Sequence, residues 1–282
     1  MKPISILIPN RFTWDAVCLT IASILKRTDY PGFRIIVADN SQAEARFDCE
    51  PHERRTIDGD NGNRLAYLRR MALEGKITLI ENQAQARHAY GHGDNIRVLL
   101  NACDTPLALL FISTAEILRP DWLSVLASKI IVPRDLGVAR FREGGQHFEN
   151  AWRMPVYWPN IMLLNMEEYS KFGHINEDWG LQQVPLSEFH RPEEFEGMRP
   201  PSEAREDPLV FCDTAWRFTE RIMHENPTGY MMHPLPSGYY TRHIQLFSGI
   251  DRNSHRPQLE YVSDKLAAIK ERLAMLQKDP GA

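Results

Sequence analysis

The sequence predicts an α/β fold built on a mostly parallel β-sheet, and three observations support this prediction. Residues 4–10 and 33–39 are short apolar runs rich in β-branched side chains, as expected of strands that are buried on both faces. A helical stretch at about 13–26 separates them, and a strand, helix, strand order places two strands parallel. The same alternation returns in a strand at 77–81, a helix at 91–102 and a strand at 107–112.

The stretches between these elements have their own patterns. Residues 42–63 are polar and rich in turn formers, so we expect an excursion from the core, followed by a helix at about 63–74. At the start of the helix predicted at 91–102, Asp94 or Asn95 is suited to cap the exposed amides. A further strand is expected at 160–165.

Polar side chains stand where the first two strands end. Pro9, Asn10 and Arg11 close the first strand, and Asp39 closes the second. Ligands of open α/β sheets bind outside the carboxyl ends of the strands. The sequence therefore predicts a nucleotide-binding crevice formed by these four residues.

Composition bounds the function classes. The chain has 282 residues, of which 43% are hydrophobic, enough for a large core. A formal net charge of -4 gives no global field that would attract nucleic acid, which argues against a dedicated nucleic-acid binder. The N-terminus does not resemble a secretion signal, and no segment approaches 18 consecutive apolar residues, so we expect a cytoplasmic protein with no membrane span.

Four cysteines lie far apart in the sequence and form no Cys-x-x-Cys pair, so neither a zinc cage nor a disulfide framework is indicated. They are Cys18, Cys49, Cys103 and Cys212. Cys18 and Cys103 fall in helical patterns and are expected to be packed thiols.

Two stretches carry a resemblance to a known family. The opening strand, helix and strand, which end in Val-Ala-Asp-Asn-Ser, and residues 118–123 (Leu-Arg-Pro-Asp-Trp-Leu) resemble family 2 glycosyltransferases of the A-type (GT-A) fold. The resemblance is specific over about the first 125 residues and looser to about residue 255. It implies a mixed, mostly parallel sheet flanked by helices, and a nucleotide-sugar donor, with a UDP-sugar favoured.

The resemblance also implies a domain plan. Residues 1–255 would form a single domain, with a nucleotide-binding half at 1–125 and an acceptor half at 126–255 that includes a loop at 176–208. Residues 256–282 would form a C-terminal helix and tail. The helix carries apolar residues three and four positions apart, a seam that fits packing on the body and a homodimer equally well.

The metal site of the resembling family is altered here. In the family a strand ends in Asp-x-Asp, which holds a divalent cation such as Mn²⁺ or Mg²⁺; counting back from Pro120 places those two acids at Ser113 and Ala115. Neither side chain supplies a carboxylate. Glu116 is the nearest acid, with two interpretations: a lone metal ligand, or a solvent-facing glutamate at a helix start. Metal-independent transfer is therefore an alternative to a metal-dependent one.

Without a metal, basic side chains would have to stabilise the departing diphosphate. The candidates are Arg11, Arg87, His88, Arg242 and His243. In the family a histidine in a late segment reaches the metal or the diphosphate, and His243 resembles it. By the same resemblance, Asn95 stands at the start of the helix before the fourth strand, on the nucleotide side.

An inverting transfer needs a base that takes the proton of the acceptor hydroxyl. Residues 211–217 resemble a family helix that carries acids and an arginine, and Asp213 is the first candidate, although it could instead cap its helix and pair with Arg217. Asp178, in a turn similar to the family's Gly-x-x-Asp-Glu, is another candidate. Glu206 and Asp207 are further alternatives.

Three interpretations follow. The first is a glycosyltransferase, inverting, with an altered or absent metal site and an acceptor that the sequence does not name. The second is a glycosyltransferase-like protein that binds a nucleotide or a glycan without transferring it. The third is a nucleotidyltransferase on a related sheet, which the absence of a glycine-rich basic loop after residues 4–10 disfavours.

Overall fold

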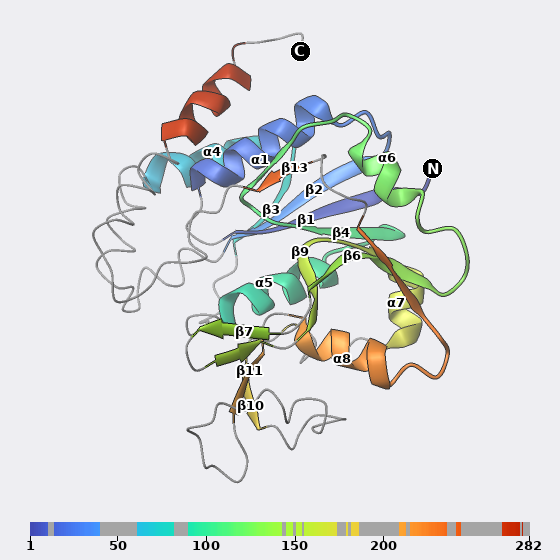
Figure 1. Ribbon diagram of the computed structural model, residues 1–282. Coiled ribbons are helices and arrows are strands. Elements are labelled where there is room, and N and C mark those ends of the chain that lie inside the picture. The colour runs from blue at the N-terminus through green and yellow to red at the C-terminus, as the bar shows by residue number, and fades with distance from the viewer. Residues whose placement is uncertain are drawn as a thin grey trace.

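The computed structural model describes residues 1–10, 14–39, 61–81, 90–142, 145–148, 151–153, 155–173, 179, 182–185, 209–212, 215–235, 241–243, 267–276 and 278 (Figure 1). Seven strands form the main sheet: β1 (Ile4–Asn10), β2 (Phe33–Asp39), β3 (Thr78–Glu81), β4 (Leu107–Phe111), β6 (Asp135–Arg142), β9 (Val156–Asn165) and β12 (Met231–Pro234). The helices are α1 (Trp14–Arg27), α4 (Asn61–Leu73), α5 (Tyr90–Asn101), α6 (Trp122–Ala127), α7 (Met166–Phe172) and α8 (Trp216–His224), and residues 267–276 form a C-terminal helix.

The main sheet is mixed and mostly parallel, which confirms the predicted fold class. Its order is β12-β6-β9-β4-β1-β2-β3. β9 runs antiparallel to both β4 and β6, whereas all other neighbours in the sheet are parallel. The carboxyl ends of β1, β2, β3, β4 and β6 therefore share one edge of the sheet.

Alternating side chains of the strands build two cores. Ile4, Ile6 and Ile8 of β1 pack on one face with residues of α1, α4 and α6. Leu7 of the same strand packs on the other face with residues of α5, α7 and α8. Figure 1 shows the helices in these two layers. β1, β4 and most of β2 are buried on both faces, which explains why their sequences are continuous apolar runs rather than alternating ones.

Two smaller sheets lie outside the main one. One has the order β10-β11-β8-β7, made by β7 (Gly145–Phe148), β8 (Ala151–Arg153), β10 (Gln182–Pro185) and β11 (Leu209–Cys212). The other pairs β5 (Ala115–Ile117) with β13 (Thr241–His243). β10 lies within the predicted loop at 176–208; the rest of that loop, apart from Trp179, lies outside the described residues.

The first half of the chain follows the sequence prediction closely, with element ends that differ by one or two residues. Three features differ. Residues 115–117 form a strand that was not predicted. β9 begins at Val156 rather than at 160. Asn95 lies inside α5 rather than at its cap, because that helix already begins at Tyr90.

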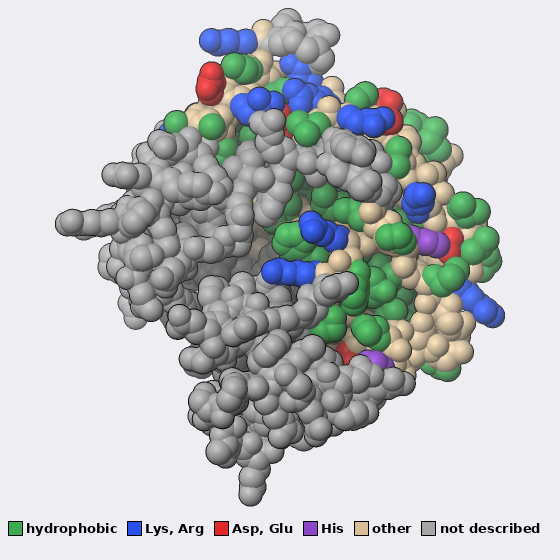
Figure 2. All heavy atoms as spheres, viewed as in Figure 1, with side chains coloured by type: hydrophobic (Ala, Val, Ile, Leu, Met, Phe, Trp, Pro, Cys, Tyr) green, Lys and Arg blue, Asp and Glu red, His purple; other side chains and the backbone are tan. Residues whose placement is uncertain are grey.

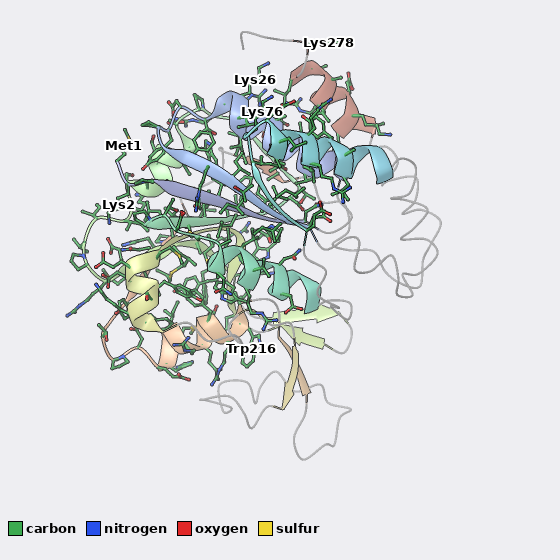
Figure 3. The ribbon with its side chains drawn as sticks, turned by 180° about the vertical axis from the view of Figure 1, so that it is seen from behind. Met1, Lys2, Lys26, Lys76, Trp216 and Lys278 are labelled. Atoms are coloured by element: carbon green, nitrogen blue, oxygen red, sulfur yellow. The ribbon has the colours of Figure 1, made fainter. Side chains whose placement is uncertain are left out.

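The C-terminal helix packs on the body of the protein. Ile269 is buried against Ala16 and Leu19 of α1, and Leu273 and Leu276 pack on the same cluster. The Lys26 ammonium group, beside this helix in Figure 3, donates a 3.0 Å hydrogen bond to the carbonyl oxygen of Leu276. The described part of the apolar seam therefore serves intramolecular packing, and a homodimer through this helix stays a prediction.

The side chain of Cys18 is 4% exposed and packs in the core, as predicted. Burial raises the pKa of this thiol to about 12. Cys103 is half-buried at the end of α5. Within the described part of the chain, no helix has both the length and the apolar character needed to cross a membrane.

Candidate functional site

Three buried polar side chains meet at the carboxyl ends of β1 and β2. Asn10 and Asp39 are register partners, and the Asn10 amide nitrogen lies 2.5 Å from a carboxylate oxygen of Asp39. The amide of Asn95, from the second turn of α5, donates to the carbonyl oxygens of Asn10 at 3.2 Å and Ala38 at 3.3 Å. All three side chains are at most 3% exposed. The structure thus brings together three residues predicted for the nucleotide site; we call Asn10, Asp39 and Asn95 the strand-end cluster.

The contacts of Asn95 explain its position better than a capping role does. A buried amide must satisfy its donors, and the last carbonyl groups of two parallel strands have no ladder partner beyond the sheet edge. Through these two hydrogen bonds, Asn95 connects α5 to the ends of β1 and β2 and positions the helix relative to them. The pair of glycines at 91 and 93 precedes it in the same helix.

An arginine extends the polar edge to β3. Glu81, which ends β3, is the register partner of Asp39 and accepts two hydrogen bonds from the Arg69 guanidinium of α4, at 2.7 and 2.6 Å. The hydrogen bond from Arg69 lowers the pKa of Glu81. The same hydrogen bond and the negative charge of Glu81 raise the pKa of Arg69, and the charge of Asp39 adds to this increase. The strand ends therefore carry acids with an arginine close to them.

The turn after β4 is fixed to α1 by Thr20. Its buried hydroxyl lies 2.7 Å from the carbonyl oxygen of Ala115 and 3.0 Å from that of Ser113, and it accepts a 3.2 Å hydrogen bond from the Ala115 amide. Ser113 is 6% exposed and Ala115 1% exposed. The positions where the resembling family has its two acids thus lie in an ordered turn that carries no carboxylate.

The late segment with the predicted diphosphate ligands lies beside this turn. β13 pairs antiparallel with β5, so that His243 is the register partner of Ala115 and Arg242 that of Glu116. The backbone of residues 241–243 therefore runs beside residues 115–117, although more than 120 residues separate the two segments in the sequence. Sequence reasoning had joined these segments through the resemblance alone.

Glu116 is not a solvent-facing glutamate at a helix start. It lies in β5, it is 0% exposed, and both of its carboxylate oxygens accept hydrogen bonds from guanidinium groups. Arg272 of the C-terminal helix binds both oxygens at 2.7 Å, and Arg27 of α1 binds one of them at 3.1 Å. Two neighbouring guanidinium groups repel a divalent cation. Glu116 is therefore a poor ligand for a divalent metal ion in this arrangement.

The donor set of the described residues does not fit a divalent cation. In that part of the chain no group of three or more His, Cys, Asp or Glu side chains could hold a metal ion. Ser113 and Ala115 have no carboxylate, and Glu116 is taken up by Arg27 and Arg272. Mg²⁺ and Mn²⁺ bind through carboxylates and other hard oxygen ligands, so no step below is assigned to a metal.

The two predicted catalytic bases are each followed closely in the sequence by residues that the structure describes. Asp178 and Asp213 are outside the described residues, as are Arg11, Arg87, His88, Glu206 and Asp207. Trp179, which follows Asp178, is fully buried, stacks on Phe218 with ring centroids 5.2 Å apart, and donates to the Tyr169 hydroxyl at 3.1 Å.

The helix after Asp213 begins at Trp216. Its N-cap position is taken by Ala215, in the left-handed region at φ 71°. Ala215 therefore holds the N-cap position itself, while Asp213 lies outside the described residues and its capping alternative stays a prediction. Arg217 has Glu220 at 2.7 Å and Glu225 at 3.6 Å as ion-pair partners.

Two arginines that the sequence analysis did not select lie at the same edge of the sheet. Arg140 and Arg142 end β6, and their guanidinium groups lie 5.9 and 5.8 Å from the ring centroid of Trp158 in β9. Arginines two residues apart in a strand share a face, and this spacing was the available signal. It was missed because β6 had not been predicted.

Comparisons with known proteins give similarities in three-dimensional structure only. No protein-family model and no curated protein sequence matches this chain. Among solved structures, GalNAc-T7 with UDP, GalNAc and Mn²⁺ is 12% identical with a TM-score of 0.44, over 64% of this chain and 38% of that one.

Two further solved structures are similar at the same level. The mannosyltransferase PcManGT from Pyrobaculum calidifontis, in complex with GDP-Man and Mn²⁺, is 12% identical with a TM-score of 0.43, over 100% of this chain and 76% of that one. TarS of S. aureus is 13% identical with a TM-score of 0.40, over 62% of this chain and 31% of that one. This chain thus spans well under half of GalNAc-T7 and of TarS.

Proposed function

We propose that this protein is a glycosyltransferase of the GT-A type that moves a sugar from a nucleotide-sugar donor, with a UDP-sugar favoured, to an acceptor hydroxyl with inversion. The observation that carries the proposal is the strand-end cluster. It is a set of buried amides and a carboxylate at the carboxyl ends of two adjacent parallel strands, where open α/β sheets bind nucleotides.

The nucleoside would bind over the ends of β1 and β2. Asp39 supplies an acceptor for the N–H or hydroxyl donors of a base or a ribose, and Asn10 holds that carboxylate in one orientation at 2.5 Å. Asn95 fixes the backbone on which both residues lie. Because these side chains are already ordered, binding a ligand costs them little conformational entropy. Pro9 and Arg11 adjoin it in sequence.

The diphosphate would lie over the turn at Ser113–Ala115, two strands from Asp39 in the sheet order. Two strand spacings are about 10 Å, a distance that a nucleoside diphosphate can bridge. We assign the stabilisation of the leaving diphosphate to His243, Arg242 and Arg11. Support comes from the backbone of β13, which runs directly beside this turn. Cationic side chains stabilise a departing diphosphate electrostatically, and this needs no metal.

The base would be Asp213, with Asp178 as the second candidate. In an inverting transfer the acceptor oxygen bonds to the anomeric carbon as the bond from that carbon to the diphosphate oxygen breaks, and the base takes the acceptor proton. Asp213 lies between β11 and α8, and Asp178 precedes the buried Trp179. Both positions fall within residues 126–255, the predicted acceptor half.

A second function has its own supporting observation. The family's acid positions carry Ser113 and Ala115 here, and the adjacent Glu116 is bound by two arginines. A protein that has lost its metal ligands without a replacement would bind a nucleotide or a glycan but would not transfer a sugar. Turnover, rather than binding, separates this candidate from the first.

The first experiment is a thermal melt of the full chain with a panel of nucleoside diphosphates and their sugars. Each ligand is tested with Mn²⁺, with Mg²⁺ and with EDTA. A ligand that binds only the folded protein raises its Tm, by an amount that follows its concentration relative to Kd. We expect one nucleoside diphosphate to raise the Tm in EDTA, which would also identify the base of the donor.

Other outcomes of the melt have different meanings. Stabilisation that requires a metal would show that ligands outside the described residues complete a cation site. No response to any nucleotide would overturn the proposal. Release of the nucleoside diphosphate from the donor that stabilises best is then measured; binding with no release in the presence of any acceptor tested would favour the non-catalytic protein.

A further inference from the structure

We propose that Arg140, Arg142 and Trp158 bind an anionic acceptor, one that carries a phosphate or a carboxylate group. The proposal deepens the proposed function and rests on it for the word acceptor. The binding of an anion by these three residues, which we call the arginine–tryptophan site, stands on their geometry alone.

The sheet extends past β4 at this point. Phe111, the last residue of β4, is the register partner of Ile161, so residues 156–160 of β9 continue beyond the end of β4, and residues 156–158 among them pair with β6. The Ile112 amide donates a 2.8 Å hydrogen bond to the carbonyl oxygen of Asn160. Trp158 is two residues further along the strand, so it lies within about 7 Å, measured along the strand, of the residue that anchors the turn after β4.

A register shift gives the extension its shape. Ala139 is the partner of Met162, but the next residue of β6, Arg140, is the partner of Trp158, so three residues of β9 have no partner in β6. Pro159 is among them, and proline cannot donate to a ladder. Irregularities of this kind bend a strand and redirect its side chains at the edge of a sheet, often next to active sites.

Both guanidinium groups lie over one ring. Both lie within 6 Å of the centroid of Trp158, at 5.9 and 5.8 Å, on the same face of β6. Within the described ranges neither arginine has a carboxylate partner; their ring contacts are with Trp158 alone. Most other arginines of that part of the chain do have one, among them Arg27, Arg69, Arg217 and Arg272.

Two like charges over one ring, with no carboxylate partner among the described residues, favour the binding of an anion. Arg140 is exposed, and Arg142 and Trp158 are half-buried, so a ligand can reach them. Figure 2 shows basic side chains within the hollow of this face, among hydrophobic ones, over the region of β6 and β9 in Figure 1. Guanidinium groups bind phosphate and carboxylate in a bidentate manner.

The place of the site in the sheet favours the acceptor over the donor. In the order β6-β9-β4-β1-β2, the turn after β4 lies between β6 and Asp39 of β2. Four strand spacings, about 19 Å, separate β6 from β2, and the proposed path of the donor covers only the two between β2 and β4. An anion at Arg140 and Arg142 therefore lies on the side of the transferred sugar that faces away from the nucleoside.

The test uses glycerol 1-phosphate and glucuronate as probes, with neutral glycerol as the uncharged reference, and follows binding to the full chain by ligand-detected NMR. We expect at least one anion to bind and glycerol not to bind. In the double variant Arg140→Gln/Arg142→Gln the affinity should fall at least tenfold, while the shift in Tm caused by a nucleoside diphosphate should not change.

The matched control is Arg70→Gln/Arg119→Gln. Arg70 also lies over an aromatic ring, 5.2 Å from the centroid of Tyr67, and the change in net charge is the same. This control should bind the probes as the unaltered protein does. Equal loss in both double variants would mean that only net charge matters, and it would overturn the site.

Competition separates the two sources of phosphate. The probe is titrated again at a saturating concentration of the nucleoside diphosphate that stabilises the protein. Simultaneous binding supports an acceptor site, whereas mutual exclusion would assign the arginines to the donor's diphosphate and overturn the proposal. If the probe binds through the arginines but no nucleotide binds at all, the anion site stands and the proposed donor function fails.

Discussion

Arg272 binds the carboxylate of Glu116 with both arms of its guanidinium group, Nε to Oε2 and Nη2 to Oε1, each at 2.7 Å. The two residues are 156 positions apart in the sequence. Glu116 lies in β5, directly after the turn of Ser113–Ala115, and Arg272 lies in the C-terminal helix. This pair, with Arg27, attaches the end of the chain to the segment where the resembling family holds its metal.

Removing this pair should destabilise the protein. We expect Arg272→Ala to lower the free energy of unfolding by roughly 2 to 4 kcal/mol, because truncation leaves a buried carboxylate with only Arg27 as its partner. The measurement is urea denaturation. Lys270→Ala, in the same helix and exposed, is the matched control and should change the free energy of unfolding by less than about 0.5 kcal/mol. Equal effects of the two substitutions would contradict a specific role for the pair.

Asp39 should matter for nucleotide binding. Asp39→Ala removes the buried acceptor that Asn10 orients, and we expect affinity for the nucleoside diphosphate to fall by about 10- to 100-fold, which corresponds to the loss of one buried hydrogen-bond partner. Isothermal titration of the folded variant measures it. Asp104→Ala, whose side chain is 72% exposed beside Arg34, is the control. Unchanged affinity in Asp39→Ala would remove the strand-end cluster from the site.

The base should affect turnover but not binding of the donor. For Asp213→Asn we expect turnover to fall by about 10²- to 10⁴-fold, the usual contribution of general base catalysis, with donor affinity nearly unchanged. Steady-state release of the nucleoside diphosphate gives kcat, and the Tm shift gives affinity. Asp121→Asn, in the exposed pair with Arg119, serves as the control. Full activity in Asp213→Asn would move the role to Asp178, and the same pair of measurements on Asp178→Asn tests that.

Asp135 should make stability depend on pH in the acid range. Burial of this carboxyl raises its pKa, but hydrogen bonds from the Val132 amide, His233 and the Ile131 amide outweigh burial and lower it overall. A group with a depressed pKa in the folded state stabilises the protein above its ordinary pKa of 3.8, and this contribution is lost as pH falls through the folded-state value.

The comparison of the unaltered protein with Asp135→Asn isolates this effect. The difference in free energy of unfolding should be constant between pH 5 and 7 and should shrink as pH falls below about 4, as linkage requires. Urea denaturation at each pH measures it. Since Asp135 lies at the amino end of β6, away from the carboxyl edge, the affinity for nucleoside diphosphate should not change in the variant at pH 7. A difference that grows toward low pH would contradict the depressed pKa.

Much of the fold of residues 1–125 could be predicted from the sequence because its signals are local. The β-branched runs at β1, β2 and β4 are buried on both faces, so apolar composition alone marks them. Asn10 and Asp39 could be placed together for a similar reason: residues that end adjacent parallel strands lie at one edge, whatever else the chain does.

The strands after residue 125 were harder to predict because they do not show such a signal. β6 is buried over its first five residues and then carries Arg140, Phe141 and Arg142 toward solvent, so it reads as neither a buried nor an alternating strand. β9 is interrupted by Pro159 and by the register shift. The arginine–tryptophan site could not be foreseen, since it depends on the pairing of these two strands.

The sequence by itself determined the α/β class, the order of the first strands and helices, the positions of Asn10 and Asp39, and the absence of a carboxylate at Ser113 and Ala115. Each of these depends on residue types or on contacts close in the sequence. Only the tertiary structure decided the roles of Asn95 and Glu116. An asparagine near a helix start and a glutamate near a turn are locally ambiguous; their partners, the strand ends of β1 and β2 and the distant Arg272, are set by the packing of the whole chain.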